Sequence, residues 1–559
     1  MTEDTAWRTL SKVSSPTNGI QAGDTIRFKR GCIWRADYTG NLSASQLQVR
    51  SGLAGKHTTY TDYGSQDLSK PSILFSISLN KTADWVLMDG LWRTATPLIN
   101  SLQWWVSDAG NILFDGHIVS YKKWSKEDLQ KDRDFWFDKD LFYVWVKSSD
   151  NPAIVYNEVE VCLGRGVGVN LAEAKHVTIS NLDLRYNASH AIFGHDCENI
   201  TIRNVDISWI GGGEQFSFDT PQVRFGNGIE FWNNASDCLV ENCTIHEVYD
   251  HAISLEGSRA TQYEKKRITC RNNTARNCES VFTPMVHGAD LTFENIIFEN
   301  NTMISSGFGW GRYPEQRPDD FASSNLFLSG SVTFSENFII RNNISIGSRV
   351  ALNRFYIFEA LRILTEFDNN IYSQQLSAGS CIAKIKLYGS VHFDAYDWLV
   401  YLKFLKYFFP EKNFEKNSVF DGFDNHYLKD LNISVEGEIT KYANVSSLTN
   451  FIDGDFFEEL WDLPDNDPQV SIQIDATSST MGRISLFRRY PSAKTGEVGS
   501  GRTIPNRISF TNFENENDYI DMTLKKVSSG TTHIAFGWNT ALGEISDLNA
   551  TLRIINMQK

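Results

Sequence analysis

Residues 176–187 read HVTISNLDLRYN, and residues 199–210 repeat the pattern as NITIRNVDISWI. Each copy alternates apolar and polar residues, reaches an Asn and starts alternating again, which is typical of a short strand, a bend and a second strand. The phrase returns at 238–248, 267–278, 290–301 and 337–348. One unit that recurs with extra residues inserted at one point of its cycle indicates a coil of stacked strands.

One asparagine marks the predicted bend of each copy: Asn181, Asn204, Asn242, Asn272, Asn295 and Asn342. Asn tolerates the left-handed backbone conformation, and Asn side chains stacked in register can form a hydrogen-bonded ladder. A unit this short cannot bury its own apolar face, so each turn has to stack on the last. A plain antiparallel sandwich with Asn-rich turns is the alternative that the pattern leaves open.

These repeats resemble those of the right-handed parallel β-helix, the fold of the pectate-lyase-like polysaccharide-degrading proteins that include phage tailspike depolymerases. The resemblance spans roughly residues 20–425, and QAGDTIRFKRGCIWRADYTG at 21–40 is similar to the opening of many such carbohydrases. It implies an all-β chain with a right-handed parallel β-helix over 1–429. Alternating strands with turn signals over 430–559 suggest a C-terminal β-sandwich that binds carbohydrate or joins subunits. The resemblance transfers no catalytic residue, because no family catalytic motif is present.

Two segments are expected to be helical or to close an end of the coil. AWRTLSKV at 6–13 is a short amphipathic stretch that can cap the open end. Residues 396–412 place apolar residues at helical spacing before a Pro, which predicts one amphipathic helix.

The composition narrows the choice of partners. A net charge of −15 argues against nucleic acid and against anionic membrane surfaces, although it does not exclude a locally bound anionic substrate. No apolar run is long enough for a membrane span. The 8 cysteines form no CxxC pair, and no dense acidic loop resembles a calcium site, so we expect no disulfide framework, metal or cofactor. The 15 Trp suit binding to sugar rings, although large cores also contain Trp.

The first residues, MTEDTAWRTLSKV, lack the charged, apolar and small-residue order of a signal peptide. We expect an extracellular protein in one of two settings. One is a virion tail spike, a homotrimer freed by cell lysis. The other is a secreted bacterial carbohydrase whose signal is not part of this sequence.

Three phrases align as successive turns: SHAIFGHD at 189–196, GNGIEFWN at 226–233 and DHAISLEG at 250–257. If Ile192, Ile229 and Ile253 point inward, period-two alternation turns two columns of side chains outward. One column is Phe193, Glu230 and Ser254, and the next is His195, Trp232 and Glu256. A further column before the strand holds His190, Asn227 and His251, with Asp250 beside it.

Two carboxylates on adjacent turns suit a glycosidase, in which one acid protonates the leaving oxygen and the other activates water or attacks the sugar. Strand spacing places the Glu230 and Glu256 backbones about 8 Å apart. We expect Glu230 and Glu256 as the catalytic pair, with Asp250 as a substitute for either and His251 and His190 as orienting groups. Solvated surface acids are the alternative interpretation.

Two insertions rich in Gly, aromatic and charged residues, at 211–225 and 305–324, are expected to wall a binding groove. The substrate-binding candidates are His190, His195, Trp232, Glu214, Arg259, Trp310 and Arg312, with Trp232 and Trp310 as sugar platforms.

Three functions remain open. The first is hydrolysis of a bacterial capsule or O-antigen polysaccharide. The second is elimination at a uronic acid, with His251 as base and Arg259, Lys265 or Arg267 as the stabilising cation. The third is binding of carbohydrate without catalysis, as in an adhesin.

Overall fold

The computed structural model describes residues 6–38, 44–99, 108–164, 166–215, 222–258, 262–286, 291–312, 317, 323–330, 334–355, 361–374, 381–388, 391–395 and 398–423, and beyond them the strands between 443 and 556. The chain divides into two compact units. One comprises Met1–Ile371 and Ile382–Val419, and the other comprises Tyr372–Cys381 and Phe420–Lys559.

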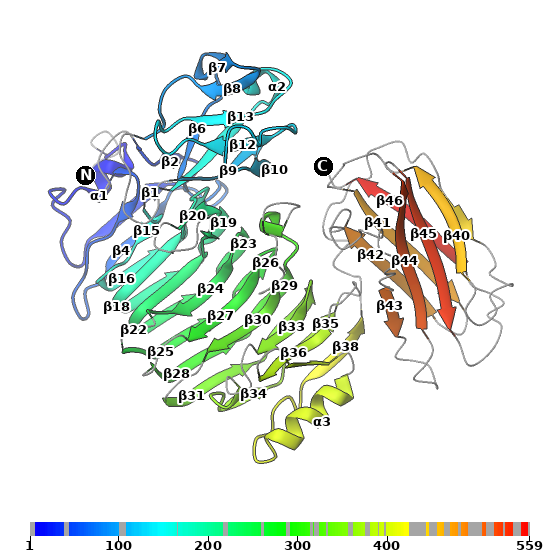
Figure 1. Cartoon of the computed structure of the whole chain (residues 1–559). Coiled ribbons are helices and arrows are strands. Elements are labelled where there is room, and N and C mark those ends of the chain that lie inside the picture. The colour runs from blue at the N-terminus through cyan, green and yellow to red at the C-terminus, as the bar shows by residue number, and fades with distance from the viewer. Residues whose placement is uncertain are drawn as a thin grey trace. The chain divides into compact units, whose positions relative to one another are not determined.

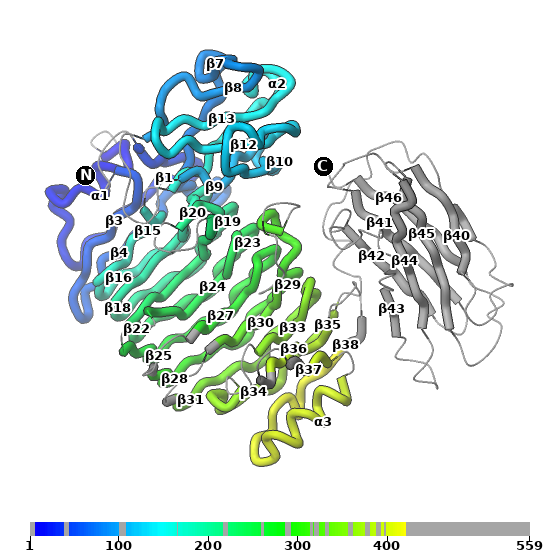
Figure 2. The backbone as a smooth tube through the Cα atoms, in the orientation of Figure 1, coloured from blue at the N-terminus to red at the C-terminus, as the bar shows by residue number. Residues whose placement is uncertain are grey.

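The first unit is a coil of parallel strands that stack along one axis (Figures 1 and 2). Each turn contributes to three sheets, and the long strands β18 (Ile192–Arg203) and β22 (Ile229–Glu241) bend from the first sheet into the second. The first sheet also contains β15 (Val169–Asn170), β24 (His251–Glu256), β27 (Ser280–Val286), β30 (Ser324–Gly330) and β33 (Ala351–Phe355). The second contains β16 (Lys175–Ser180), β25 (Tyr263–Arg271), β28 (Leu291–Glu299), β31 (Phe334–Arg341) and β34 (Glu366–Asp368).

The third sheet has ten strands and runs the length of the coil: β2 (Ile33–Arg35), β5 (Ser72–Leu74), β17 (Asp183–Arg185), β19 (Asp206–Ile210), β23 (Thr244–Val248), β26 (Thr274–Arg276), β29 (Thr302–Ser306), β32 (Ile344–Ser348), β35 (Ile371–Gln374) and β38 (Val419–Phe423). From β2 to β32 its neighbouring strands pair in parallel. Parallel pairing of consecutive turns excludes the antiparallel sandwich as the architecture of this unit.

The register of the first sheet confirms the predicted alternation. Ile192 pairs with Ile229, which pairs with Ile253 in the next turn, and their exposed fractions are 0%, 0% and 1%. The three isoleucines form an inward column, as expected from period two. In the three turns that the sequence alignment joined, these isoleucines therefore line the interior of the coil.

The bends between the second and third sheets carry the predicted asparagines, with one correction. Asn181, Asn204, Asn242, Asn272 and Asn342 all have left-handed φ values, between 51° and 58°. In the remaining turn the bend residue is Asn300, with φ 57°. Asn295 lies five positions earlier, inside β28, where its left-handed φ of 56° marks a different bend. The phrase DLTFENIIFENN contains several Asn, and sequence alone selected the wrong one.

A ladder of hydrogen-bonded asparagines runs inside the coil, one residue after these bends. The backbone N and Nδ2 of Asn273 both donate to Oδ1 of Asn301, each at 3.0 Å. Asn301 repeats the pattern onto Asn343 at 2.9 and 3.2 Å, and Asn343 onto Asn370 at 3.0 and 3.1 Å. All four side chains are at most 3% exposed. Each amide thus satisfies buried groups of the neighbouring turn.

We expect Asn301→Ala to lower the free energy of unfolding by about 1–3 kcal/mol, because Asn273 and the Cys270 carbonyl would lose buried partners. Urea unfolding measures this change. Asn337→Gly is the matched control. Asn337 is exposed and donates to Asn295, and Gly keeps its φ of 53°. The ladder would have no energetic role if both variants unfolded at the same urea concentration.

An antiparallel module interrupts the coil between β5 and β15. It contains a four-stranded sheet of β10 (Ile118–Val119), β9 (Asp108–Phe114), β14 (Val159–Gly164) and β6 (Ser76–Ser78). A five-stranded sheet is formed by β11 (Tyr121–Lys122), β12 (Asp134–Phe137), β13 (Val144–Val146), β8 (Leu91–Thr94) and β7 (Trp85–Met88). Trp85, Phe114 and Phe135 lie in one shared core. The β-helix predicted over 1–429 is thus interrupted by this module, because alternation alone does not separate parallel from antiparallel strands.

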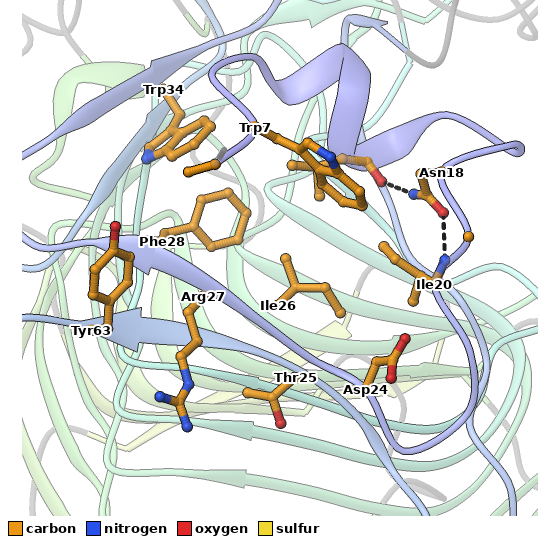
Figure 3. Close-up of a pocket in the computed structure, with 13 residues that line it drawn as sticks. Trp7, Asn18, Ile20, Asp24, Thr25, Ile26, Arg27, Phe28, Trp34 and Tyr63 are labelled. Atoms are coloured by element: carbon orange, nitrogen blue, oxygen red, sulfur yellow. Dashed lines mark hydrogen bonds between the residues drawn. The ribbon is translucent and has the colours of Figure 1, made fainter. Parts of the chain in front are cut away.

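The first turn of the coil leaves a cavity of about 490 Å³, shown in Figure 3. Trp7, Ile26, Phe28, Trp34 and Tyr63 are among its lining residues. Ile26 lies on β1 (Thr25–Lys29) and pairs with the buried Tyr60 of β4 (Thr58–Tyr63), so the cavity opens onto the end of the core.

The helix α1 (Leu10–Ser14) lies at the same end and buries Leu10 and Val13. It contacts β3 (Leu47–Gln48), and the segment predicted as a cap therefore covers part of this end of the coil.

The helix α3 (Trp398–Phe408) occupies the stretch predicted to be amphipathic, with Tyr401, Phe404 and Leu405 buried. The second unit contains two four-stranded antiparallel sheets, the arrangement expected for a β-sandwich. One is formed by β39 (Ala443–Val445), β46 (Asn549–Asn556), β41 (Val470–Ser478) and β42 (Gly482–Arg489). The other is formed by β40 (Phe456–Asp462), β45 (Thr531–Asn539), β44 (Tyr519–Ser528) and β43 (Asn506–Ser509). Among the described residues, no helix is long and apolar enough to span a membrane.

Candidate functional site

The outer face of the first sheet gathers the predicted site residues at β18, β22 and β24. Phe193 pairs with Glu230 and Glu230 with Ser254, while Trp232 pairs with both His195 and Glu256. Both outward columns thus have the register that the sequence indicated. The carboxyl groups of Glu230 and Glu256 come from adjacent turns and from adjacent columns of one face.

Asn227 connects the two carboxyl groups. Its Nδ2 lies 3.0 Å from Oε2 of Glu230, 3.2 Å from Oε1 of Glu256 and 3.1 Å from Oγ of Ser254. Because both carboxyl oxygens contact the same nitrogen, they are no more than about 6 Å apart, within the range over which two acids influence each other's ionisation. Asn227 also accepts the backbone N–H of His251 on its Oδ1 at 2.9 Å.

His190 is the second neighbour of Glu230. Its Nδ1 lies 2.8 Å from Oε2 of Glu230 and 3.0 Å from the backbone N of Asn227. A ring nitrogen has one in-plane position, so it either accepts from Asn227 or carries a proton that it donates to Glu230. The two contacts therefore compete for the same position on Nδ1.

The surroundings of the two carboxyl groups shift their pKa values in opposite directions. Burial alone would raise the pKa of Glu230, but the charge of His190 and hydrogen bonds from His190 and Asn227 outweigh it and lower this pKa. Burial and the neighbouring charge of Glu230 raise the pKa of Glu256 well above its usual range. Glu256 therefore holds a proton while Glu230 is ionised, which is the division of roles that an acid and base pair needs.

The two carboxyl groups should change the pH dependence of the free energy of unfolding in opposite directions. Glu256 has a raised pKa when folded, so the unfolded state loses its proton first, and the contribution of Glu256 to the free energy of unfolding falls as pH rises above about 4.3. Glu256→Gln removes this loss. We expect the stability of Glu256→Gln relative to wild type to increase steadily between pH 4 and 8 in urea unfolding.

Glu230→Gln should show the opposite trend. The lowered pKa of Glu230 means that its stabilising contribution is present above about pH 4.3 and is lost as pH falls through the folded pKa. This variant should therefore be most destabilised near neutral pH and least in acid. Parallel pH profiles for the two variants would contradict the assignment of protons within the pair.

His251 lies beside the pair and is 6% exposed. Its Nδ1 is 2.5 Å from Oγ of Ser280, the paired residue of the next turn. Burial lowers the pKa of His251. The ring is therefore neutral at physiological pH, as a base or an orienting group has to be.

The carboxylate of Asp250 binds groups other than Glu230 and Glu256. Its Oδ1 accepts from the Arg317 guanidinium, and its Oδ2 accepts the backbone N–H of Gly226 at 2.8 Å. Arg317 also stacks over the ring of Tyr249, with 4.2 Å from Cζ to the ring centroid. Both oxygens of Asp250 are thus occupied, which disfavours it as a substitute for Glu230 or Glu256.

Trp310 and Arg312 do not fit the predicted roles in sugar binding. Trp310 is 1% exposed, and its Nε1 donates to the Glu247 carbonyl at 2.9 Å. Arg312 forms a buried two-pronged ion pair with Glu279. The sequence showed that an insertion carries these residues but not that they point inward. They anchor the insertion to the coil.

Another predicted groove residue, Glu214, lies elsewhere. Glu214, in β20 (Gly213–Glu214), is ion-paired with Lys139 and accepts the backbone N–H of Gln222 at 2.9 Å. Its backbone N donates to Asp108, so it belongs to a charged cluster beside the antiparallel module. Arg259 lies outside the described residues, as do Asp219, Asp319 and Asp320 of the insertions.

Two of the three cations considered for elimination, Lys265 and Arg267, lie away from the outer face or are already paired. Lys265 points into the coil and is 0% exposed. Arg267 makes two hydrogen bonds to Asp237, at 2.6 and 2.7 Å. The Lys265 ammonium and the Arg267 guanidinium are therefore not placed to stabilise charge beside His251.

Trp232 and His195 remain at the partly exposed edge of the site, next to Glu256. Nδ1 of His195 lies 3.0 Å from Oδ2 of Asp196, and its Nε2 lies 3.3 Å from Nδ2 of Asn233. A half-buried indole beside an acid can contact a sugar ring through its apolar face. The binding roles of Trp232 and His195 stay predictions.

Sequence reasoning did not assign the roles of Asn227, Ser254, Glu279 and Arg317. Asn227 and Ser254 were detectable, because they share columns with His190 and Glu230 in the aligned turns. Glu279 and Arg317 were not, since their partners lie on different turns and on an insertion. Among the described residues, no group of three or more His, Cys, Asp and Glu could hold a metal ion.

Residues 143–339 match the family model described as the right handed beta helix region. No curated protein matches the sequence. The solved structures that it resembles include an alginate lyase from Paenibacillus sp. str. FPU-7, with 13% identity over 68% of this chain and 90% of that chain and a TM-score of 0.33. They also include a polygalacturonase from Erwinia carotovora ssp. carotovora, with 9% identity, coverage of 70% and 96% and a TM-score of 0.29.

A third similar structure is PfbA, a surface adhesin of Streptococcus pneumoniae, with 11% identity over 72% of this chain and 85% of that chain and a TM-score of 0.22. The family match and the parallel pairing of successive turns together identify the coil as a right-handed parallel β-helix. The predicted fold of the first unit is thereby confirmed.

Proposed function

For this right-handed parallel β-helix protein, we propose hydrolysis of a glycosidic bond in a polysaccharide bound along the outer face of the first sheet. The observation that carries the proposal is the pair of carboxyl groups of Glu230 and Glu256, which share the Asn227 amide and have pKa values displaced in opposite directions. Two titratable acids with separated acidity are the components that glycosidic hydrolysis requires.

Glu256 is the proton donor in this proposal. It is protonated because of burial and the charge of Glu230, and it is the partly exposed member of the pair. Transfer of its proton to the glycosidic oxygen lets the leaving sugar depart as a neutral alcohol. The proton loss is coupled to Glu230, since a negative Glu256 is disfavoured beside a second carboxylate.

Glu230 is the carboxylate that attacks the anomeric carbon or activates water. Its side chain is 2% exposed. Retaining glycosidases place the two carboxyl groups about 5–5.5 Å apart, and inverting enzymes about 6.5–9.5 Å apart. The shared contact with Asn227 brings the bonded oxygens within about 6 Å, which favours attack by Glu230 and retention of configuration.

The test is digestion of a panel of capsular, O-antigen, plant and algal polysaccharides in water enriched in oxygen-18. Hydrolysis adds one labelled oxygen per cleavage, whereas elimination adds none and produces absorbance near ~235 nm from the unsaturated sugar. We expect labelled products from wild type. Glu256→Gln and Glu230→Gln should each lower kcat about 100-fold or more.

Glu264→Gln is the matched control, because Glu264 is an exposed acid of the following turn that pairs with Lys266. Its kcat should equal that of wild type. A loss smaller than tenfold in Glu230→Gln, with an altered pH profile, would assign Glu230 to tuning Glu256 instead of attack.

Elimination is the second candidate, and His251 is the observation in its favour. Its neutral imidazole beside the site suits removal of a proton next to a uronate carboxylate. Unlabelled, unsaturated products that disappear in His251→Gln would replace hydrolysis by elimination. A polysaccharide that binds tightly and yields no product would instead support the adhesin.

The resemblance to tailspike depolymerases supports a bacterial surface glycan as the substrate, an extracellular or virion location and a homotrimer as part of this proposal. Light scattering of the full chain distinguishes the settings, since a secreted carbohydrase is expected to be a monomer.

A further inference from the structure

Lys265 occupies an unusual place for a lysine, in the interior of the coil. The register aligns it with Ala235 of the preceding turn and with Phe293 of the next, in an inward column that also contains Cys197. Its side chain is 0% exposed. In the described part of the chain no carboxylate forms an ion pair with it, and an ammonium group in such surroundings is costly.

The ammonium group binds the backbone of the strand that carries the site. Nζ of Lys265 donates to the Phe231 carbonyl at 2.7 Å and to the Asn233 carbonyl. These carbonyls flank Trp232, where β22 turns from the first sheet into the second and Asn233 has a left-handed φ of 50°. Ala235 in the same column is small, which leaves room for the lysine to reach across from its own turn.

β22 pairs with β24 as far as Trp232 and Glu256, and pairing resumes with β25 at Ala235 and Lys265. Among the described residues of the following turn, Asn233 therefore has no strand partner, whereas Phe231 still pairs with Leu255. A backbone carbonyl outside the strand ladder needs another donor. The lysine supplies that donor from inside the coil, and it thereby fixes the direction of the segment from which Glu230 and Trp232 project outward.

The positive charge of Lys265 also interacts electrostatically with Glu230 and Glu256 across the strand. Burial lowers the pKa of Lys265 to about 7, against the opposing effect of the Cys197, Glu230, Cys238 and Glu256 charges. In return, the Lys265 charge contributes to lowering the pKa of Glu230. The other group that faces the amine is the Tyr263 ring, 5.5 Å from Nζ to the centroid.

We propose that Lys265 is a positioning residue for the carboxyl pair: it clamps the Phe231–Asn233 bend from inside the coil, and its buried positive charge keeps Glu230 ionised while Glu256 holds the proton. Lys265 touches no substrate in this arrangement. Its catalytic consequence rests on the proposed function, whereas its coupling to Glu230 does not.

The two effects of Lys265 separate with pH. Below about pH 7 the amine is charged and provides both the clamp and the positive charge. Above that pH it loses one proton but keeps two N–H groups, which are sufficient for the two carbonyls. The clamp therefore persists at high pH, and the electrostatic support of Glu230 is lost.

The test is carbon-13 carboxyl NMR of glutamate-labelled protein, with Glu230→Gln identifying the Glu230 signal. Lys265→Met keeps an unbranched side chain and removes the charge. We expect Glu230 to titrate about 1 pH unit higher in Lys265→Met than in wild type. Cys197→Ala is the matched control, since it perturbs the same inward column without removing a cation, and Glu230 should titrate there as in wild type.

An unchanged Glu230 titration in folded Lys265→Met would overturn the proposal. If that variant does not fold, wild type alone decides, because deprotonation of Lys265 should give the Glu230 or Glu256 signal a second inflection near pH 7. A titration without this inflection would then refute the coupling.

Activity gives an independent readout. With a substrate that wild type cleaves, Lys265→Met should lower kcat more than it raises KM. The acidic limb of its pH–rate profile should move to higher pH. In Cys197→Ala that limb should stay at the wild-type pH. Absence of any cleavage by wild type would refute the proposed hydrolysis, while the NMR titration would still decide the role of Lys265.

Discussion

In-register stacking of parallel turns is the constraint on which the rest of the first unit depends. No turn buries its own apolar residues, so each residue of a column is supported by its counterparts above and below. The same constraint applies to polar groups. The Asn273 to Asn370 ladder repeats one hydrogen-bonding pattern at each step, and it satisfies backbone groups that the bend removes from the strand ladders. A single misplaced register would therefore disrupt interior packing and interior hydrogen bonds together.

The site follows from this stacking. Glu230 and Glu256 lie on different turns, and only a fixed register brings their carboxyl groups to one amide of Asn227. Their separated acidity is a product of the scaffold, since His190 on one side and burial on the other act on groups of the same chemical type. Lys265, inside the coil behind β22, also contributes to this difference in acidity. The chemistry of the outer face is thus set partly by residues that a substrate cannot reach.

Period-two alternation was sufficient to predict the coil, the inward isoleucines and both outward columns, because a strand dictates which side chains share a face. It could not distinguish Asn295 from Asn300, since a short repeat contains several residues suited to a bend. It also could not show that Trp310 and Arg312 turn inward. Their orientation depends on Glu247 and Glu279, which other turns supply. Lys265 illustrates the same limit, because a charged residue in an alternating strand is assigned to the surface by composition and to the interior only by its neighbours.

The antiparallel module has a consequence for how the molecule can vary. Its first strand, β6, and its last, β14, are hydrogen-bonded neighbours, with Ser76 opposite Cys162 and Ser78 opposite Glu160. The chain therefore leaves the coil and returns to it at nearly the same point. Such an excursion can lengthen, shorten or be exchanged without altering the pitch of the turns that follow. New surface can in this way be acquired on one side of the molecule while the geometry around Asn227 is inherited unchanged.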